Sequence, residues 1–376
     1  METDLYVQRP TVVEVNLDHI GHNLRAVKLH TPQKKVMAIV KANAYGHGLV
    51  PVANHLVSLG VDQLGVAFLE EGIVLRKAGI TLPILVLGGI FSSQIEYFFD
   101  YNLEFAVSSM EKLRQVEAVA QSKEKTAVVH LKFDTGLERI GVHVEGAGPF
   151  IEAALKSIHC RIKGVFSHLA CSDDPQSPMT GEQLEKFHEI TNHFHRLGHP
   201  MPIRHLANSG GVLHFPETHL DMIRPGLILY GVYPSQAAKR VLNVKPALSL
   251  ISRVVYFKVV QPGQTISYGA TWKAHHMIRV VTTPLGYGDG YPRALSNRGQ
   301  VLIRGKRYPI VGNICMDQFM VNIEWETAYN GDEVVLIGSR GNETILVEDL
   351  AEWAHTIPYE ILTCLNERIP RVYRPK

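Results

Sequence analysis

The chain has 376 residues, of which 45% are hydrophobic and 20% charged, and its formal net charge is +2. This composition is typical of a globular protein with room for one large and one smaller domain. Because no basic run is longer than the pair Lys34-Lys35, nucleic-acid binding is not expected. Residues 1–16 carry no apolar segment of a secretory signal, and no stretch approaches the length of a membrane span.

The spacing of the four cysteines indicates the redox compartment of the protein. Their wide separation, without a CxxC pair or zinc-like spacing, predicts reduced thiols in a cytoplasmic protein and no metal site. The four are Cys160, Cys171, Cys315 and Cys364.

The first two thirds of the chain alternate between strand-like and helix-like patterns. After a strand at 11–16 and a helix from Leu17 to about Lys28, eight apolar strand segments follow, separated by patterns such as 70–78, 109–122 and 181–197 that read as helices. Eight strands with intervening helices in about 200 residues predict an α/β fold, a (β/α)₈ TIM-type barrel. The strands are expected near 36–40, 63–66, 84–87, 104–107, 128–133, 164–167, 204–206 and 222–223.

Beyond residue 235 the pattern changes to successive strands separated by Gly and Pro turns, with one helix at 347–355. The strands are expected at 247–259, 278–283, 301–304, 308–311, 319–323 and 333–337. We therefore predict a barrel domain over 11–235 and a mainly β domain over 236–376, which the N-terminal strand is expected to join.

The stretch 36–48 carries the strongest functional signal. Five apolar residues lead directly into Lys41, and a loop with Gly46 and Gly48 follows, as expected for a buried parallel strand that ends at an active-site face. A partly desolvated lysine can act as a neutral amine that condenses with an aldehyde or removes a carbon-bound proton. Seen alone, the plainer alternative is a lysine that extends along the surface into water.

Other polar side chains stand at the ends of the predicted barrel strands, where functional residues of such barrels belong. Buried charges without partners are costly, so these side chains must pair with one another or with a ligand. An anionic cofactor accounts for the set most simply. Its members are Lys41, Lys132, Asp134, His168, His205, Ser209 and Arg224.

The stretch around Lys41 resembles the pyridoxal-phosphate-binding signature of alanine racemases, and the resemblance extends over 11–373. In that family the lysine carries the cofactor. The resemblance implies that Arg224 donates to the pyridine nitrogen, from which arginine cannot accept a proton, and that His168 and His205 are ring-stacking and supporting residues. Phosphate ligands implied in the same way are Tyr45, Ser209, Gly226, Leu227 and Tyr359. For Ser209 and Gly226 ordinary capping and turn chemistry, and for His205 a satisfied core histidine, are the plainer alternatives.

The segment 130–141 resembles a second signature of the family. There Arg139 contacts the substrate carboxylate, a task that suits a planar cation with two donors. Lys132 matches a lysine that is often carbamylated and then orients this arginine. An unmodified Lys132 paired with Asp134 is the alternative.

The β domain resembles the family in the glycine turns that hold Tyr268 and Tyr287 and in the loop of Met316 and Asp317. The resemblance implies that Tyr268 is a second catalytic base, helped by His168 and Arg224, that the Met316 amide faces the substrate carboxylate, and that Tyr287 and Asp317 support the site. In the family these loops reach the partner subunit, so a homodimer with shared active sites is expected.

Lys41 and Tyr268 on opposite faces would then interconvert L- and D-alanine, which supplies D-alanine for peptidoglycan. Racemisation needs two opposed bases, since one base returns the proton to the face it came from. A decarboxylase or broader racemase of the same fold, and a non-enzymatic pyridoxal-phosphate homeostasis protein that resembles the barrel alone, are the alternatives. Asn313, Glu138 and Pro358 depart from the family pattern and put the fine positioning of the loops in doubt.

Overall fold

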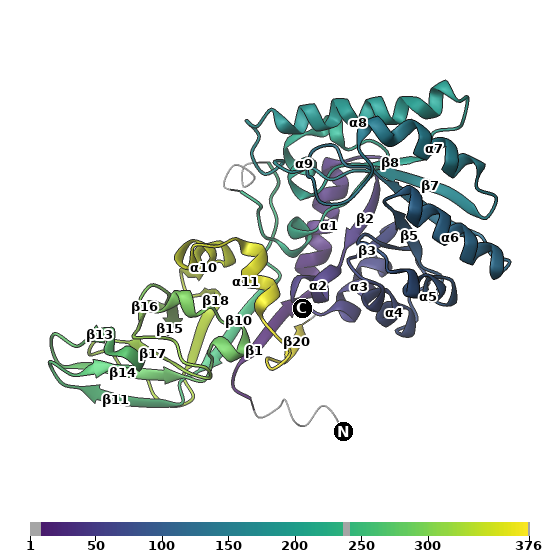
Figure 1. Ribbon diagram of the computed structural model, residues 1–376. Coiled ribbons are helices and arrows are strands. Elements are labelled where there is room, and N and C mark those ends of the chain that lie inside the picture. Colours follow the sequence, from purple (N-terminus) through teal and green to yellow (C-terminus); the bar gives the residue numbers. More distant parts are fainter. Residues whose placement is uncertain (1–8, 236–240, 375–376) are drawn as a thin grey trace.

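The computed structural model describes residues 9–235 and 241–374, which form a barrel and a separate β-rich unit (Figure 1). The barrel sheet has eight strands in the order β8-β7-β6-β5-β4-β3-β2-β9. Its ends meet where Asp221 N donates to Arg204 O at 3.2 Å and Arg224 N donates to Ala207 O at 2.9 Å. The predicted (β/α)₈ barrel is confirmed. The strands are β2 (Lys35–Ile39), β3 (Gln63–Val66), β4 (Ile84–Val86), β5 (Glu104–Val107), β6 (Ala127–Lys132), β7 (Cys160–Phe166), β8 (Ile203–His205) and β9 (Met222–Ile223).

Helices surround this sheet, and the longer ones bury an apolar stripe against it. In α6 (Met110–Ser122) the buried positions are Leu113, Val116 and Ala120, at helical spacing, and Ser109 caps the first turn by accepting from Lys112 N at 3.1 Å. Every described helix is too short or too polar to span a lipid bilayer. The others in this unit are α1 (Leu17–His30), α2 (Lys41–Tyr45), α3 (Leu49–Ser58), α4 (Leu69–Lys77), α5 (Ile95–Asp100), α7 (Ala147–Lys156), α8 (Met179–Arg196) and α9 (Ser209–His214).

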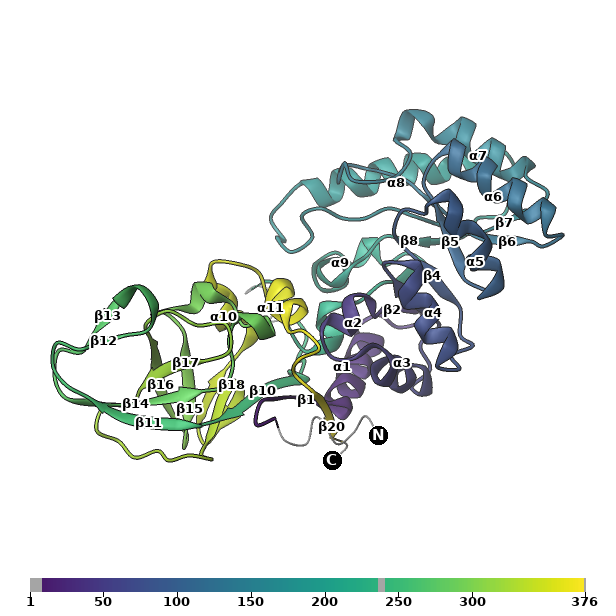
Figure 2. The same ribbon diagram turned by 60° about the horizontal axis from the view of Figure 1, so that its bottom comes forward.

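The second unit is a largely antiparallel sheet of ten strands (Figure 2). The N-terminal strand β1 (Val12–Asn16) belongs to it, since β1 pairs with β10 and, in parallel, with the C-terminal strand β20. The remaining strands are β10 (Leu248–Arg253), β11 (Tyr256–Val260), β14 (Ile278–Thr283), β15 (Gln300–Ile303), β16 (Lys306–Val311), β17 (Phe319–Asn322), β18 (Glu333–Arg340), β19 (Glu343–Ile345) and β20 (Arg371–Arg374), with β12 (Thr265–Ile266) and β13 (Trp272–Lys273) as a separate hairpin.

Two features of this unit differ from the sequence-based expectation. The strand expected at 247–259 is two strands, because the chain changes partner between them: Val254 N donates to Asp332 O and Val255 N donates to Thr282 O. A second helix, α11 (Pro358–Cys364), follows the expected helix α10 (Val347–Ala354). Pro358 occupies its first turn, where the missing N–H costs nothing.

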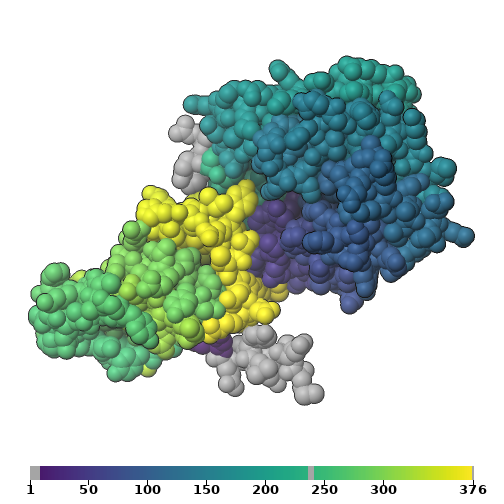
Figure 3. All heavy atoms as spheres, in the orientation of Figure 1, coloured from purple at the N-terminus to yellow at the C-terminus, as the bar shows by residue number. Residues whose placement is uncertain are grey.

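Helix α11 and β20 bring the end of the chain back to the barrel. In the space-filling view the C-terminal residues lie between the β-rich unit and the N-terminal part of the barrel (Figure 3). This return places Tyr359 at the barrel mouth. The expected boundary between 235 and 236 adjoins residues 236–240, which lie outside the described residues.

Candidate active site

A cavity at the barrel mouth collects nine of the residues that the sequence singles out. They come from the ends of five barrel strands, from the following loops and from α11, as expected for the functional face of such a barrel. The nine are Lys41, Tyr45, Lys132, Arg139, His168, Ser209, Arg224, Gly226 and Tyr359.

Lys41 opens a turn with an unusual backbone. Residues 42–45 have φ between 51° and 54°, a left-handed conformation that costs about 1–2 kcal/mol per non-glycine residue. Glu71 fastens the turn, because its Oε1 accepts from Ala42 N at 2.6 Å and its Oε2 accepts from Ala67 N at 2.7 Å. Such strain persists only where the surroundings enforce it, commonly at functional sites. The turn allows Lys41 and Tyr45 to line the same cavity.

The environment of Lys41 lowers the pKa of its amine. Burial is the largest effect that lowers its pKa, and Arg139 lowers it further, while Glu71 opposes the shift and Arg224 adds to it. A neutral amine is the form that attacks a carbonyl or accepts a proton. The lowered pKa therefore raises the fraction of Lys41 that faces the cavity as the neutral amine.

A ring of donors next to Lys41 suits an anion. The Ser209 hydroxyl oxygen accepts from Gly226 N at 3.0 Å and so joins the loop after β8 to the loop after β9. A Cβ at Gly226 would lie 2.5 Å from Tyr45 Oη, so only glycine leaves room for the phenol. Burial raises the pKa of Tyr45 and of Tyr359, which keeps both phenols as O–H donors.

The remaining predicted cradle residue, Leu227, is fully buried and begins the 3₁₀ turn η4 (Leu227–Tyr230). It contributes its backbone to this loop rather than a side chain in the cavity.

Arg224 is buried beside the cavity and is held by both terminal nitrogens. Nη2 donates to Ser167 O at 2.7 Å, to Leu206 O at 3.1 Å and to His168 Nδ1 at 3.3 Å. Nη1 donates to His205 Nδ1 at 3.1 Å. Burial, followed by the charge of Arg224, lowers the pKa of both histidines well below the usual value. His168 and His205 are therefore neutral acceptors for the guanidinium.

Lys132 is also buried, and its pKa falls to about 7 through burial first and then through the charges of Arg224 and Arg139, against the opposing effect of Asp134. The Asp134 carboxylate does not take Lys132 as a hydrogen-bond partner in the described structure. It accepts instead from the backbone N–H groups of 136, 137, 138 and 139 and shapes the loop that holds Arg139.

Glu138, one of the three departures from the family pattern, lies in the loop after Asp134. Glu138 adopts φ 54°, a conformation that favours small or polar residues, and its carboxylate pairs with His143 at 2.8 Å.

The β-domain residues lie apart from this cavity. Tyr268, in η6 (Tyr268–Ala270), is 73% exposed and Met316 is 53% exposed. The described residues that line the cavity include none from the loops of Tyr268, Tyr287, Met316 and Asp317. These loops nevertheless contact one another, since Tyr287 N donates to Cys315 O at 3.1 Å and Asn313 Nδ2 donates to Tyr268 O at 2.7 Å. The Asn313 departure thus has a structural role, which is to hold the Tyr268 turn.

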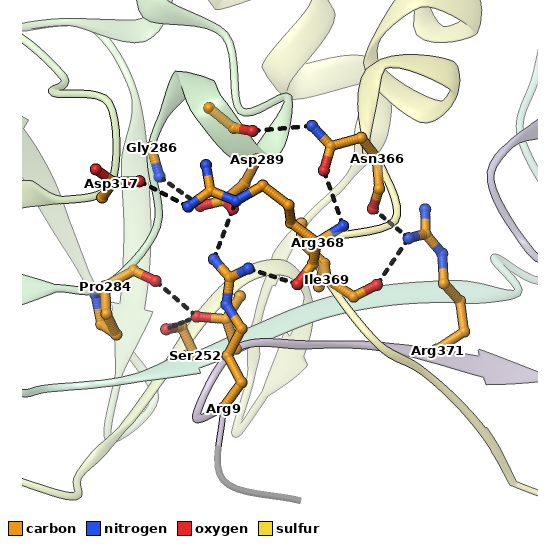
Figure 4. Close-up of polar contacts among 12 residues, drawn as sticks. Arg9, Ser252, Pro284, Gly286, Asp289, Asp317, Asn366, Arg368, Ile369 and Arg371 are labelled. Atoms are coloured by element: carbon orange, nitrogen blue, oxygen red, sulfur yellow. Dashed lines mark hydrogen bonds and ion pairs between the residues drawn. The ribbon is translucent and has the colours of Figure 1, made fainter. Parts of the chain in front are cut away.

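A polar cluster missed by the sequence reasoning fastens two of these loops (Figure 4). The fully buried Asp289, in η7 (Tyr287–Asp289), pairs with Arg9 at 2.6 Å and lies 3.4 Å from Arg368. Arg368 also pairs with Asp317 at 2.7 Å, and Asn366 Nδ2 donates to Gly288 O at 2.9 Å. Asp317 and the glycine-flanked Asp289 stand in loops that the sequence singles out, but their arginine partners, Arg9 and Arg368, lie near the two ends of the chain and gave no signal.

The fold and the cavity define a class of protein: a (β/α)₈-barrel enzyme with a buried amine beside an anion-binding cradle, joined to a β-rich domain. The chain belongs to the alanine racemase family. The family model for the alanine racemase N-terminal domain matches residues 15–234, and the model for the C-terminal domain matches residues 247–373.

Individual alanine racemases match this chain over nearly its full length. The alanine racemase of Carboxydothermus hydrogenoformans is 44% identical over 367 residues, which are 97% of this chain and 100% of the relative. The solved alanine racemase of Streptomyces coelicolor A3(2) superimposes with a TM-score of 0.95 at 34% identity and covers 99% of this chain and 100% of that one. A structure of the Bartonella henselae alanine racemase with covalently bound pyridoxal phosphate has a TM-score of 0.89 at 28% identity, with coverage of 97% and 99%.

Proposed function

We propose that this protein interconverts L-alanine and D-alanine with pyridoxal 5′-phosphate bound through Lys41. One observation carries the proposal: the Lys41 amine, the buried Arg224 and the donor cradle line a single cavity at the barrel mouth. The match over both family domains favours this function over the barrel-only homeostasis protein.

The residues present fit this cofactor. Ser209, the backbone of Gly226 and Leu227, and the phenols of Tyr45 and Tyr359 would hold its phosphate, because they form a cradle that a side chain at Gly226 would fill. Arg224 would donate to the ring nitrogen beside His168. Both terminal nitrogens of Arg224 already have protein acceptors, whereas Nε has no acceptor among residues 9–235 and 241–374. When bound, the cofactor draws electrons away from the Cα–H bond of the amino acid.

Lys41 would exchange the α-proton on one face of the substrate, and Tyr268 of the partner subunit on the other. The exposed position of Tyr268, outside the cavity of its own chain, supports this arrangement. We propose accordingly that the protein is a homodimer in which the barrel, 11–235, binds the cofactor, while the β domain, 236–376 together with the N-terminal strand, supplies Tyr268 to the partner subunit.

The substrate carboxylate would be bound by Arg139 and by the Met316 amide, with Tyr287 and Asp317 supporting that loop. Lys132 would orient Arg139 once carbamylated, which its lowered pKa favours. We further propose that the enzyme acts in the cytoplasm and supplies D-alanine for peptidoglycan.

The test combines spectroscopy with a chiral assay. The purified protein should absorb in the visible region, convert L-alanine into a racemic mixture, and retain the cofactor on the Lys41 peptide after borohydride reduction. A label on another lysine would refute the assigned site. Amine production from the amino acid without D-alanine would instead favour the decarboxylase.

A further inference from the structure

A line of buried polar side chains crosses the barrel interior below Arg224. Glu104 begins β5, His130 lies in β6 and His205 ends β8. His205 Nε2 lies 2.8 Å from His130 Nδ1, and His130 Nε2 lies 3.0 Å from Glu104 Oε2. Both histidines are fully buried, and Glu104 is 8% exposed. The line therefore connects the lower end of the barrel to the arginine at its mouth.

The chemistry of the two ends sets the direction of every hydrogen bond in this line. Arginine has no acceptor, so Arg224 Nη1 must donate to His205 Nδ1. The proton of neutral His205 is then on Nε2 and is donated to His130 Nδ1, which leaves the His130 proton on Nε2, facing Glu104. An ionised carboxylate only accepts, so the Glu104 end enforces the same direction.

Glu104 is well placed to remain ionised. Lys163 Nζ donates to its Oε1 at 2.6 Å, and Gln63 Nε2 donates to its Oε2 at 2.7 Å. Burial alone would raise the pKa of Glu104, but the hydrogen bonds that it accepts from His130 and Lys163, together with the charge of Lys163, outweigh burial and lower this pKa below the usual value.

Packing does not account for such a line. Barrel interiors are normally filled with branched apolar side chains, and apolar residues of similar volume are often no less stabilising than buried charged groups. Phe166 further restricts the line, since its ring stacks on His205 with centroids 4.8 Å apart and planes within 8°. The stacking thus fixes the plane of the His205 ring, while the proton on this ring decides which of its two nitrogens donates.

We infer that Glu104 and His130 are positioning residues that hold His205 in its Nε2–H tautomer and thereby aim Arg224 Nε at the ring nitrogen of the cofactor. In the opposite tautomer, His205 Nδ1 would carry a proton that faces the N–H of Arg224 Nη1, 3.1 Å away. The two donors would repel each other and displace the guanidinium. This inference rests on the proposed function in assigning Nε to the cofactor, whereas the tautomers themselves can be observed without it.

Neutron diffraction from a deuterium-exchanged crystal of the holoenzyme tests the relay directly. We expect deuterium on Nε2 of both His130 and His205 and none on either Nδ1. Deuterium on Nδ1 of either ring would overturn the relay. Failure of the proposed function would be seen separately, as absence of a cofactor on Lys41.

A pair of variants separates positioning from packing. Glu104→Gln removes the obligate acceptor, and Glu117→Gln makes the same change on α6, where the carboxylate accepts from Ile158 N and His159 N and has no connection to Arg224. Folded Glu104→Gln should show an Nδ1–H signal from His205 in ¹⁵N NMR spectra and an altered cofactor absorption band. Its kcat should be about 10- to 100-fold lower, the range typical of metal sites in which a ligand loses its outer hydrogen-bond partner.

The KM of that variant should change little, and Glu117→Gln should match the wild type in all three measurements. A folded Glu104→Gln with wild-type tautomers and absorption would overturn the proposal. If this variant does not fold, the neutron result on the wild type decides the question.

Discussion

Lys132 should take up carbon dioxide at neutral pH because its amine is buried beside two arginines. With a pKa of about 7, about half of this amine is neutral at pH 7, whereas an ordinary lysine with a pKa near 10.4 is neutral in roughly 0.04% of molecules. Only the neutral amine attacks carbon dioxide. The enrichment is therefore about a thousandfold, and the resulting negative charge would face Arg139 and Arg224.

The assay is ¹³C NMR of the holoenzyme, in which the cofactor occupies Lys41, equilibrated with ¹³C-labelled bicarbonate. The neutral fraction of Lys132 rises as pH passes upward through 7, from about one tenth at pH 6 to about nine tenths at pH 8. We expect about one carbamate per chain at pH 8 and several-fold less at pH 6. Lys132→Met should abolish this signal, and Lys306→Met, at an exposed lysine paired with Glu326, should preserve it. A signal that survives in Lys132→Met, or is absent from the wild type at pH 8, would refute the reasoning.

Three further outcomes follow from the site. Arg224→Glu should let the ring nitrogen of the cofactor keep a proton, lower racemisation on the order of 100-fold and produce a transamination by-product; an unchanged product ratio would contradict the role of Arg224. Gly226→Ala places a Cβ 2.5 Å from a phenol oxygen, and an overpacking cost of about 1–3 kcal/mol should weaken cofactor binding to the apoenzyme about 5- to 150-fold in a titration, whereas Gly181→Ala, with open space around its Cβ, should bind normally. Mixing inactive Lys41→Ala and Tyr268→Ala homodimers should restore about a quarter of wild-type activity, because half of the dimers are mixed and half of their sites are intact; exchange without recovery would place Tyr268 in its own chain's site or outside the reaction.

Some features of the fold and of the site could be predicted from the local sequence pattern alone. Most strand segments of the barrel are largely apolar, and in β3 and β5 every residue is buried. The regular spacing of such segments let the sequence alone predict the barrel. Lys41 was recognisable because a lysine that directly follows such a run and precedes a glycine loop stands at the functional end of a barrel strand. Where the pattern was uniform, the same reasoning failed: residues 247–259 have strand character throughout, and nothing local indicated that β10 and β11 pair with different neighbours.

The sequence by itself determined the (β/α)₈ class and the strand ends at which the polar residues stand. The reason is that a strand buried on both faces is largely apolar along its length, and such a segment can be recognised in the sequence. Only the tertiary structure decided which partners those residues take. It turned Asp134 toward its own backbone, joined Arg9 to Asp289 across the length of the chain, and linked Glu104 to Arg224 through two histidines. The last two of these contacts depend on distances between strands and loops far apart in sequence, and a hydrogen bond exists only where the closed fold brings donor and acceptor to about 3 Å.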